Sequence, residues 1–142
     1  MANLHEIIQW CDQTLKAAEF KAYAPNGLQI EGSTEVKRIV CAVTASEDAI
    51  DAAIAQNADL LLVHHGYFWK GEPYPITGMR GNRIKKLIQN NISLVAYHLP
   101  LDAHPTLGNN VAIAEKLNLK NLEPLDLTEK HPIGNIGYLE KE

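Results

Sequence analysis

The chain has 142 residues, of which 46% are hydrophobic and 21% are charged, and its formal net charge is −4. This length is typical of one domain, so we expect a single domain over residues 1–142. The composition excludes a disordered chain, a collagen and a disulfide scaffold, and the negative charge disfavours nucleic-acid binding. The first residues do not show the basic region and apolar stretch of a signal peptide, and no window approaches the roughly 18 apolar residues of a membrane span. We therefore expect a cytoplasmic location and no membrane partner.

The first third of the chain predicts two helices separated by two strands. Asn3 caps a helix over about residues 4–19, in which apolar side chains recur at helical spacing. A turn precedes a short apolar strand at 28–30, and a β-branched strand follows at 38–44. Ser46 then caps a second helix. Cys11 and Cys41 belong to no Cys-x-x-Cys pair, and we interpret both as reduced core residues.

The same alternation continues through the middle of the chain. Residues 59–63 and 92–97 predict buried strands, residues 82–91 and 109–117 predict helices, and a loop is expected over 99–108. Repeated βα units predict an α/β fold, a parallel sheet with helices on both faces and right-handed crossovers. Residues 133–139 resemble the entry to a further strand.

Histidines and one carboxylate follow two of the predicted strands directly. His64 and His65 end one strand, His98 ends the next, and Asp102 comes four residues later. Carboxyl ends of parallel strands share one edge of the sheet, where ligands bind in open α/β folds. Such side chains suit zinc, iron, manganese or nickel, and two metals could share them.

Each of these residues also has a simpler interpretation, because a lone histidine at a strand end is more often a hydrogen-bonded structural residue. Neighbouring residues of a strand point to opposite faces, so His64 and His65 serve one metal only if the backbone turns. Otherwise each serves a different metal. His104 is a weaker candidate that can simply cap its loop.

Two further segments leave alternatives open. Tyr67, Phe68 and Trp69 lie beside the histidines, where they can form a stacking platform for a heterocycle with Lys70 near a phosphate, or fill a subunit interface or the core. A basic cluster follows, consisting of Arg80, Arg83, Lys85 and Lys86. It can receive a phosphate or form a solvated helix face.

Four motifs together resemble the NIF-three-like family, whose members are often labelled GTP cyclohydrolase I type 2 homologues. They are Tyr-Ala-Pro-Asn-Gly-Leu-Gln (23–29), Val-Thr-Ala-Ser (43–46), Val-His-His-Gly-Tyr-Phe-Trp-Lys-Gly (63–71) and His-Leu-Pro-Leu-Asp-Ala-His-Pro (98–105). The resemblance covers residues 23–119 and implies a NIF-three-like α/β fold, a dinuclear metal centre and a toroidal homohexamer. The family label implies hydrolytic ring opening of a purine nucleotide.

Carried over by position, the resemblance implies His64, His65 and Asp102 as ligands of two divalent metal ions. His98 matches a neighbour of the site, to which we assign an outer-sphere or proton-transfer role. Family members continue into a second half that supplies a further His and Glu, four residues apart, to the same metals. This sequence has no such pair, because Gly134 and Asn135 stand where the carboxylate would follow His131. We therefore expect an amino-terminal portion of a longer family-type chain, in which residues 130–142 begin the second half.

The sequence thus favours a metal-dependent hydrolase acting on a nucleotide-like heterocycle. In this hypothesis the metals activate a water, His98 moves a proton, and the loop over 67–69 holds the ring. The alternative is a metal-binding, ring-forming scaffold or interaction protein without turnover. In that case the aromatic loop contacts a second subunit.

Overall fold

The computed structural model describes residues 1–21 and 23–140. The chain forms two compact units, Met1–His98 and Leu99–Glu142, which are described separately below. The single domain predicted over 1–142 stays a prediction. Within the described part of the chain, no helix combines the length and the apolar character needed to cross a membrane.

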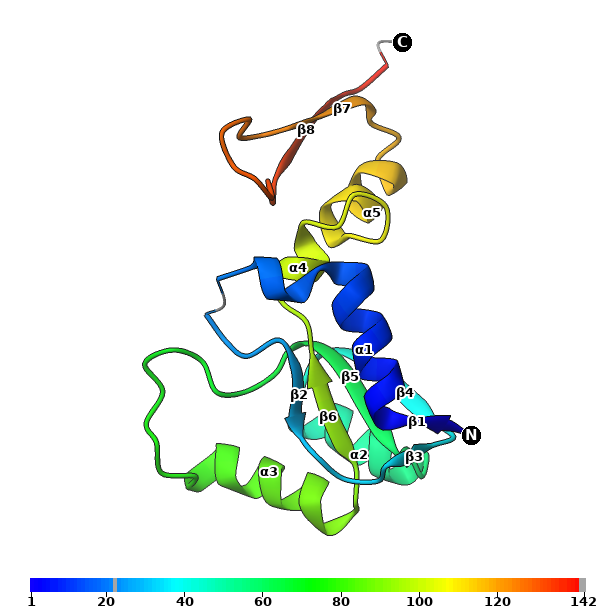
Figure 1. Cartoon of the computed structure of the whole chain (residues 1–142), viewed down its shortest axis with the longest axis vertical. Coiled ribbons are helices and arrows are strands. Elements are labelled where there is room, and N and C mark those ends of the chain that lie inside the picture. Colours follow the sequence, from blue (N-terminus) through cyan, green and yellow to red (C-terminus); the bar gives the residue numbers. More distant parts are fainter. Residues whose placement is uncertain (22, 141–142) are drawn as a thin grey trace. The chain divides into compact units, whose positions relative to one another are not determined.

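The first unit carries most of the regular structure (Figure 1). Its elements in chain order are β1 (Ala2–Asn3), α1 (Leu4–Leu15), the short 3₁₀ helix η1 (Ala17–Glu19), β2 (Gly27–Ile30), β3 (Glu35–Val36), β4 (Ile39–Thr44), α2 (Glu47–Ala55), β5 (Leu60–His65), α3 (Gly78–Gln89) and β6 (Ser93–Ala96).

The four-stranded sheet has the order β2-β6-β5-β4. β4 pairs with β5 and β5 with β6 in parallel, as the repeated βα units predict. β2 instead runs antiparallel to β6, so the sheet is mostly rather than wholly parallel. The register sets Leu62 of the central strand beside Cys41 on one side and Val95 on the other. Because β5 and β6 are adjacent and parallel, their carboxyl ends lie at the same edge.

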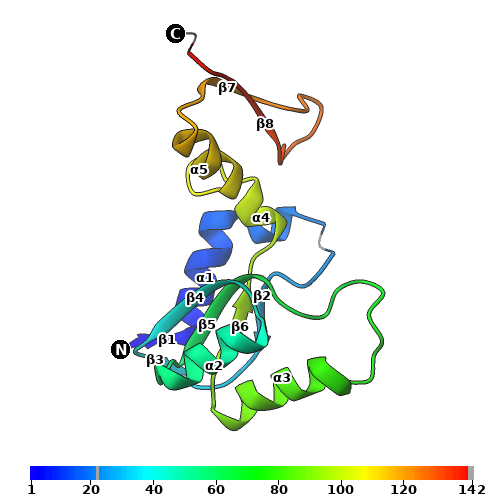
Figure 2. The ribbon, with the colours of Figure 1, turned by 180° about the vertical axis from the view of Figure 1, so that it is seen from behind.

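Helices cover both faces of this sheet. α1 lies over one face, and α2 and α3 lie over the other (Figures 1 and 2). The larger core fills the space beneath α2 and α3, where the buried residues include Ile50, Leu61, Ile84, Leu87 and Leu94. Alternation along β5 and β6 sends successive apolar side chains to opposite faces, which explains why both strands are apolar almost throughout.

Side-chain caps start two of the helices where the sequence predicts them. The Asn3 side chain accepts hydrogen bonds from the backbone N–H groups of His5 and Glu6, and the Ser46 side chain accepts one from that of Ala49. α1 ends earlier than predicted, because Lys16 adopts a left-handed conformation with φ of 51°. α3 begins earlier than predicted, at Gly78.

Cys41 corrects one prediction. Cys11 is buried under α1, but Cys41 is exposed, and both thiols are free. Along β4 the side chains of Val40 and Ala42 pack against the core, whereas Ile39, Cys41 and Val43 do not. β4 is one of the two edge strands of the sheet. Its strand pattern was read correctly, but an edge strand needs to bury only one of its faces.

The second unit contains α4 (Leu99–Asp102), α5 (Asn109–Lys116) and a hairpin of β7 (Lys120–Pro124) and β8 (Asn135–Tyr138). β8 occupies part of the predicted strand at 133–139. The predicted loop over 99–108 is wrong in part, because its first four residues form a helical turn. Pro100 is compatible with that turn, since proline needs no N–H partner at a helix start. β7 was not predicted.

Candidate metal site of three histidines

Three histidines meet at the carboxyl edge of the sheet. His64 and His65 are the last two residues of β5, and His98 follows β6 by two positions. Each offers one ligand atom, and these atoms all lie within 4.8 Å of one another. The ring centroids of His64 and His65 are 4.4 Å apart, and that of His98 is 4.9 Å from the first and 5.4 Å from the second. All three side chains are half-buried. The edge predicted from the strand order therefore gathers all three.

The neighbouring rings of β5 converge although consecutive strand residues start on opposite faces. The Nδ1 of His64 is 2.9 Å from the backbone oxygen of Tyr97, which follows β6. The Nδ1 of His65 is 3.1 Å from Oγ1 of Thr44, at the end of β4. Each imidazole is thus held by a different neighbouring strand, and both rings can still serve one site.

His98 is positioned through its backbone and its ring. Its backbone N–H donates to Oδ1 of Asn26 at 2.9 Å, and its ring meets the Trp69 indole edge-on, with centroids 4.9 Å apart at 82°. The residue before it, Tyr97, is buried, and its hydroxyl donates to Oδ1 of Asp12 at 2.7 Å. Burial and the Asp12 carboxylate raise the pKa of Tyr97, so this hydroxyl stays protonated.

The donor set fits a divalent transition-metal ion. A carbonyl oxygen only accepts hydrogen bonds, so the contact with Tyr97 places the hydrogen of neutral His64 on Nδ1 and the lone pair on Nε2. Imidazole nitrogens are common ligands of zinc, iron, copper and nickel. His64, His65 and His98 therefore could hold a metal ion.

The loop after β5 divides its aromatic residues between core and site. Tyr67 is buried, its hydroxyl donates to the backbone oxygen of Ala45 at 2.6 Å, and burial raises its pKa to about 12. Trp69 is half-buried, 6.1 Å from His65 between ring centroids, and its indole N–H donates to the Gly66 oxygen. Gln29 on β2 fixes the start of this loop, because its amide accepts from the N–H and donates to the oxygen of Tyr67.

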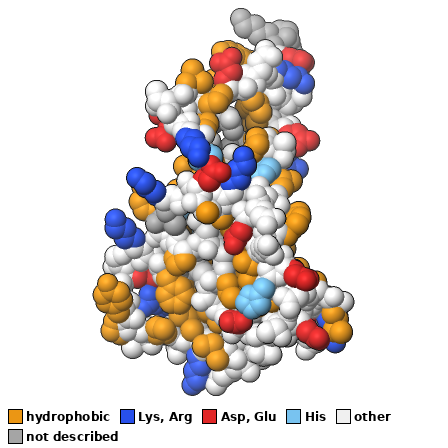
Figure 3. Space-filling view, viewed as in Figure 1, with side chains coloured by type: hydrophobic (Ala, Val, Ile, Leu, Met, Phe, Trp, Pro, Cys, Tyr) orange, Lys and Arg blue, Asp and Glu red, His pale blue; other side chains and the backbone are white. Residues whose placement is uncertain are grey.

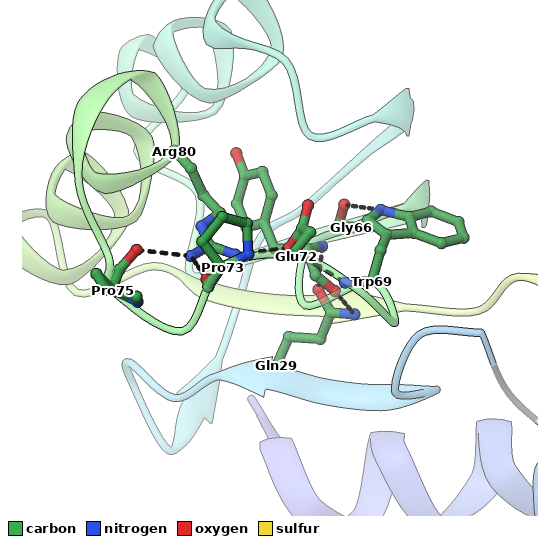
Figure 4. A network of polar contacts seen from close by, with 8 residues as sticks. Gln29, Gly66, Trp69, Glu72, Pro73, Pro75 and Arg80 are labelled. Carbon is green, nitrogen blue, oxygen red and sulfur yellow. Dashed lines mark hydrogen bonds and ion pairs between the residues drawn. The ribbon is translucent and has the colours of Figure 1, made fainter.

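A salt bridge holds the next part of the loop (Figure 4). Arg80, in the first turn of α3, donates to Oε2 of Glu72 at 2.6 Å and to the backbone oxygens of Pro73 and Pro75. The same Glu72 oxygen accepts from the backbone N–H of Trp69 at 3.2 Å. Glu72 therefore links the backbone of Trp69, whose ring lies beside the histidines, to the start of α3.

The basic cluster on α3 is largely neutralised by carboxylates. Lys86 contacts Glu47 at 2.6 Å and Asp51 at 2.7 Å, and Nε of Arg83 lies 3.8 Å from Glu47. With Arg80 paired to Glu72, three of the four predicted cations have acidic partners among the described residues. These contacts favour a structural role over phosphate binding.

Asp102, predicted as a ligand, belongs to the second unit and is the last residue of α4. Its Oδ1 accepts a hydrogen bond from the Asn109 side chain at 2.9 Å. Its role as a ligand stays a prediction. His104 caps its own loop, because its Nδ1 accepts from the backbone N–H groups of Thr106 and Leu107.

Sequence reasoning missed the residues that hold the histidines and the loop after β5. Thr44 and Gln29 were predicted only as parts of strands, and Asn26 only as part of a turn. The signal for Thr44 was present, since parallel pairing of two strands that end together sets their last residues side by side. Asn26 and Gln29 act across a β2 pairing that has no local sequence signature.

Comparison with known proteins gives a consistent result. The model of the Duf34/NIF3 (NGG1p interacting factor 3) family matches residues 2–142. A Haemophilus influenzae protein named GTP cyclohydrolase 1 type 2 homolog is 56% identical over 126 residues, which cover 89% of this chain and 50% of that protein. A Vibrio cholerae protein of the same name is 60% identical over 108 residues, covering 76% of this chain and 43% of that protein. The chain spans about half the length of the curated relatives it matches.

Solved structures agree. The structure titled protein ybgI, of unknown function, superposes with a TM-score of 0.84 at 47% identity, covering 87% of this chain and 49% of that one. A Thermus thermophilus structure gives 0.82 at 40% identity, covering 88% and 52%. By sequence model, relatives and fold together, this chain belongs to the Duf34/NIF3 family.

Proposed function

We propose that the chain contributes to a metal-dependent hydrolase that acts on a nucleotide-like heterocycle. One observation carries the metal-binding part of this proposal: the ligand atoms of His64, His65 and His98 lie within 4.8 Å of one another at the carboxyl edge of the sheet. The names of the curated relatives support the class of reaction and substrate. Because the chain spans about half the length of those relatives, its hydrolytic activity and its substrate are both part of this proposal.

In this proposal His64 and His65 bind metal through one imidazole nitrogen each, and Asp102 is a further ligand in a centre of two divalent ions, as the family resemblance implies. A divalent ion supplies Lewis-acid activation of water. His98 is placed to bind the same ion or to move a proton, because its ring lies 4.9 Å from His64 between centroids. Zinc, iron, manganese and nickel are all compatible with these donors.

Trp69 gives the site its apolar wall. Its indole packs edge-on against His98, and its N–H group is already satisfied by the Gly66 oxygen. A planar heterocycle gains from contact with such a fixed aromatic side chain, because stacking and edge contacts add to simple burial. We therefore propose that Trp69 contacts the ring of the substrate. We also propose a cytoplasmic location, where the two thiols stay reduced.

Elemental analysis of the purified chain tests the metal site. Wild type should bind metal close to stoichiometrically, and His64→Ala combined with His65→Ala should abolish it. His5→Ala is the matched control, because His5 lies on α1 and contacts Glu31 at 3.3 Å, outside the cluster. Equal metal in the double variant and the control would refute the site. Loss of guanine absorbance during incubation with GTP then tests hydrolysis directly.

A ring-forming scaffold remains the second candidate, and one surface favours it. Hydrophobic side chains gather over the loop between β5 and α3 (Figure 3). In this loop Tyr74 is 100% exposed and Ile76 is exposed, as is Met79 in the first turn of α3. Arg80 holds the backbone on both sides of Tyr74, so this apolar surface is preorganised for contact.

Light scattering separates the two candidates. In the scaffold hypothesis Tyr74→Ser lowers the molar mass of a homo-oligomer, such as the hexamer implied by the family, and leaves the metal content unchanged. In the hydrolase hypothesis Trp69→Ala weakens nucleotide binding without changing the molar mass. An unchanged mass for Tyr74→Ser would remove the argument for this surface.

A further inference from the structure

Thr44 and His65 are brought together by strand register. β4 and β5 pair in parallel with Thr44 directly opposite His65, two residues beyond the pair of Ala42 and Val63. Paired residues of adjacent strands project to the same face of a sheet. As a result Oγ1 of Thr44 lies 3.1 Å from Nδ1 of His65. The backbone pairing thus sets the two residues side by side, and their side-chain conformations close the contact.

The two histidines of β5 differ in what fixes the hydrogen of their rings. The partner of His64 is the Tyr97 carbonyl, which only accepts, so the hydrogen of the neutral ring lies on Nδ1. The partner of His65 is a hydroxyl, which can donate or accept. If Thr44 donates, the hydrogen of neutral His65 is on Nε2 and that atom has no lone pair for a metal. If Thr44 accepts, Nε2 is free to bind.

We propose that Thr44 is a positioning residue that accepts a hydrogen bond from Nδ1–H of His65 and so presents Nε2 as the ligand atom. Thr44 is exposed, so its own hydroxyl hydrogen can be donated to water. The inference rests on the proposed metal site and extends it to a residue on a third strand. It makes both histidines of β5 bind through Nε2, each supported by a different neighbouring strand.

Metal affinity gives the first test. Titration calorimetry with Zn²⁺ alone should show about 10- to 100-fold weaker binding for Thr44→Val, the size of loss typical when an outer partner of a ligating histidine is removed. Thr44→Ser keeps the hydroxyl and should bind close to wild type. Ser46→Ala is the matched control, because it removes the cap of α2 two residues away without touching a histidine.

The tautomer of His65 gives a second test, because a general loss of stability would not change which ring nitrogen carries the hydrogen. Nitrogen-15 NMR of the metal-free chain, at a pH where the ring is neutral, should show the hydrogen on Nδ1 in wild type and Thr44→Ser. Thr44→Val should shift the population toward the hydrogen on Nε2. Because Val matches Thr in shape at an exposed position, the variant should fold, and Thr44→Ala provides a second variant without the hydroxyl.

The outcomes are separable. If Thr44→Val and Thr44→Ala retain both the wild-type Zn²⁺ affinity and the wild-type tautomer, the positioning role is overturned and the metal site stands. An equal loss of affinity in Ser46→Ala also overturns it, since the effect would then come from stability alone. If His65→Ala binds Zn²⁺ as wild type does, the proposed metal site itself fails.

Discussion

The two units of the chain differ in how much of their apolar surface they bury. In the first unit helices lie over both faces of the sheet, with one face of β4 left exposed, and Leu60, Leu61, Leu87 and Leu94 are fully buried. Among described residues 99–140, only Pro100, Gly108 and Ala114 are buried. Apolar side chains of the β7–β8 hairpin are exposed instead, including Leu125, Leu127, Ile136, Tyr138 and Leu139.

This contrast shows what supports the candidate site. His64 and His65 end β5 and His98 follows β6, two strands whose apolar side chains are packed in the core, so the ligand atoms are positioned by well-packed elements. The second unit has mainly local contacts, such as the Asn109 side chain bonded to Asp102. We therefore expect stability and metal binding to depend chiefly on the first unit.

The largest expected effect comes from removing core volume. Leu94→Ala, at a fully buried position of β6, should lower the free energy of unfolding by about 2–5 kcal/mol. Leu127→Ala, at a side chain that is 83% exposed, should change it by less than about 0.5 kcal/mol. Urea denaturation of both variants measures the difference. Equal losses would show that the second unit buries more than its structure indicates.

A substitution at Gly108 should disturb the second unit and leave the first unit unchanged. A Cβ there would lie 2.3 Å from the backbone oxygen of His104 and 2.9 Å from those of Leu101 and Asp102. Gly108→Ala should therefore cost about 1–3 kcal/mol through displaced backbone. Hydrogen exchange should show lost protection in α5 and unchanged protection in β5 and β6. A loss spread over both units would mean that they unfold together.

Removing a buried hydroxyl from the first unit should lower the free energy of unfolding, whereas removing an exposed one from the second unit should not. Tyr67→Phe leaves the Ala45 oxygen without its 2.6 Å partner and should cost about 1 kcal/mol. Tyr138→Phe, at a side chain that is 57% exposed, is the matched control and should be neutral. Thermal unfolding followed by circular dichroism compares them.

The last comparison concerns two aspartates with lowered pKa values, and its effects are no larger than that of Tyr67→Phe. The pKa of Asp59 is lowered by hydrogen bonds from the backbone N–H groups of Lys37 and Arg38, which are far away in sequence. The pKa of Asp126 is lowered by hydrogen bonds from Thr128 in its own turn. A carboxylate with a lowered pKa stabilises the folded chain above its unfolded pKa of about 3.9, and the benefit disappears as pH falls through the folded value. Asp59→Asn should cost about 1 kcal/mol at pH 7, a figure reduced for partial exposure.

The pH series distinguishes the aspartates. The difference between wild type and Asp59→Asn should shrink as pH falls below about 4, because wild type then loses its charge as well. Asp126→Asn should have the smaller effect at every pH, since its bonds lie within one short turn that the unfolded chain can also form. A larger effect at Asp126 would contradict the comparison between the two units.

Much of the first unit could be predicted because its signals are local. Ser46 caps α2, apolar runs mark β5 and β6, and their alternation with helices requires parallel pairing. Parallel pairing in turn brings the ends of β5 and β6 together, so the meeting of His64 and His65 with His98 follows from the order of elements. The coarse site could thus be found from the sequence.

The remaining features depend on contacts between distant segments. β2 joins β6 antiparallel, which nothing near residues 27–30 indicates, and β4 lies at the sheet edge, which leaves Cys41 exposed. The partners of the histidine rings depend on register, because a shift of one residue between β4 and β5 would remove Thr44 from His65. Local pattern fixes which elements form, whereas pairing decides which atoms touch.

The exposed edge strand also gives the protein a chemical handle. Cys41 is the accessible thiol, whereas burial and the neighbouring Asp12 carboxylate raise the pKa of Cys11 and keep it in the unreactive protonated form. A thiol-specific dye should therefore attach to one position of the folded chain. Because β4 also carries Thr44, a fluorophore at Cys41 would report optically on the strand that holds one of the metal-binding rings.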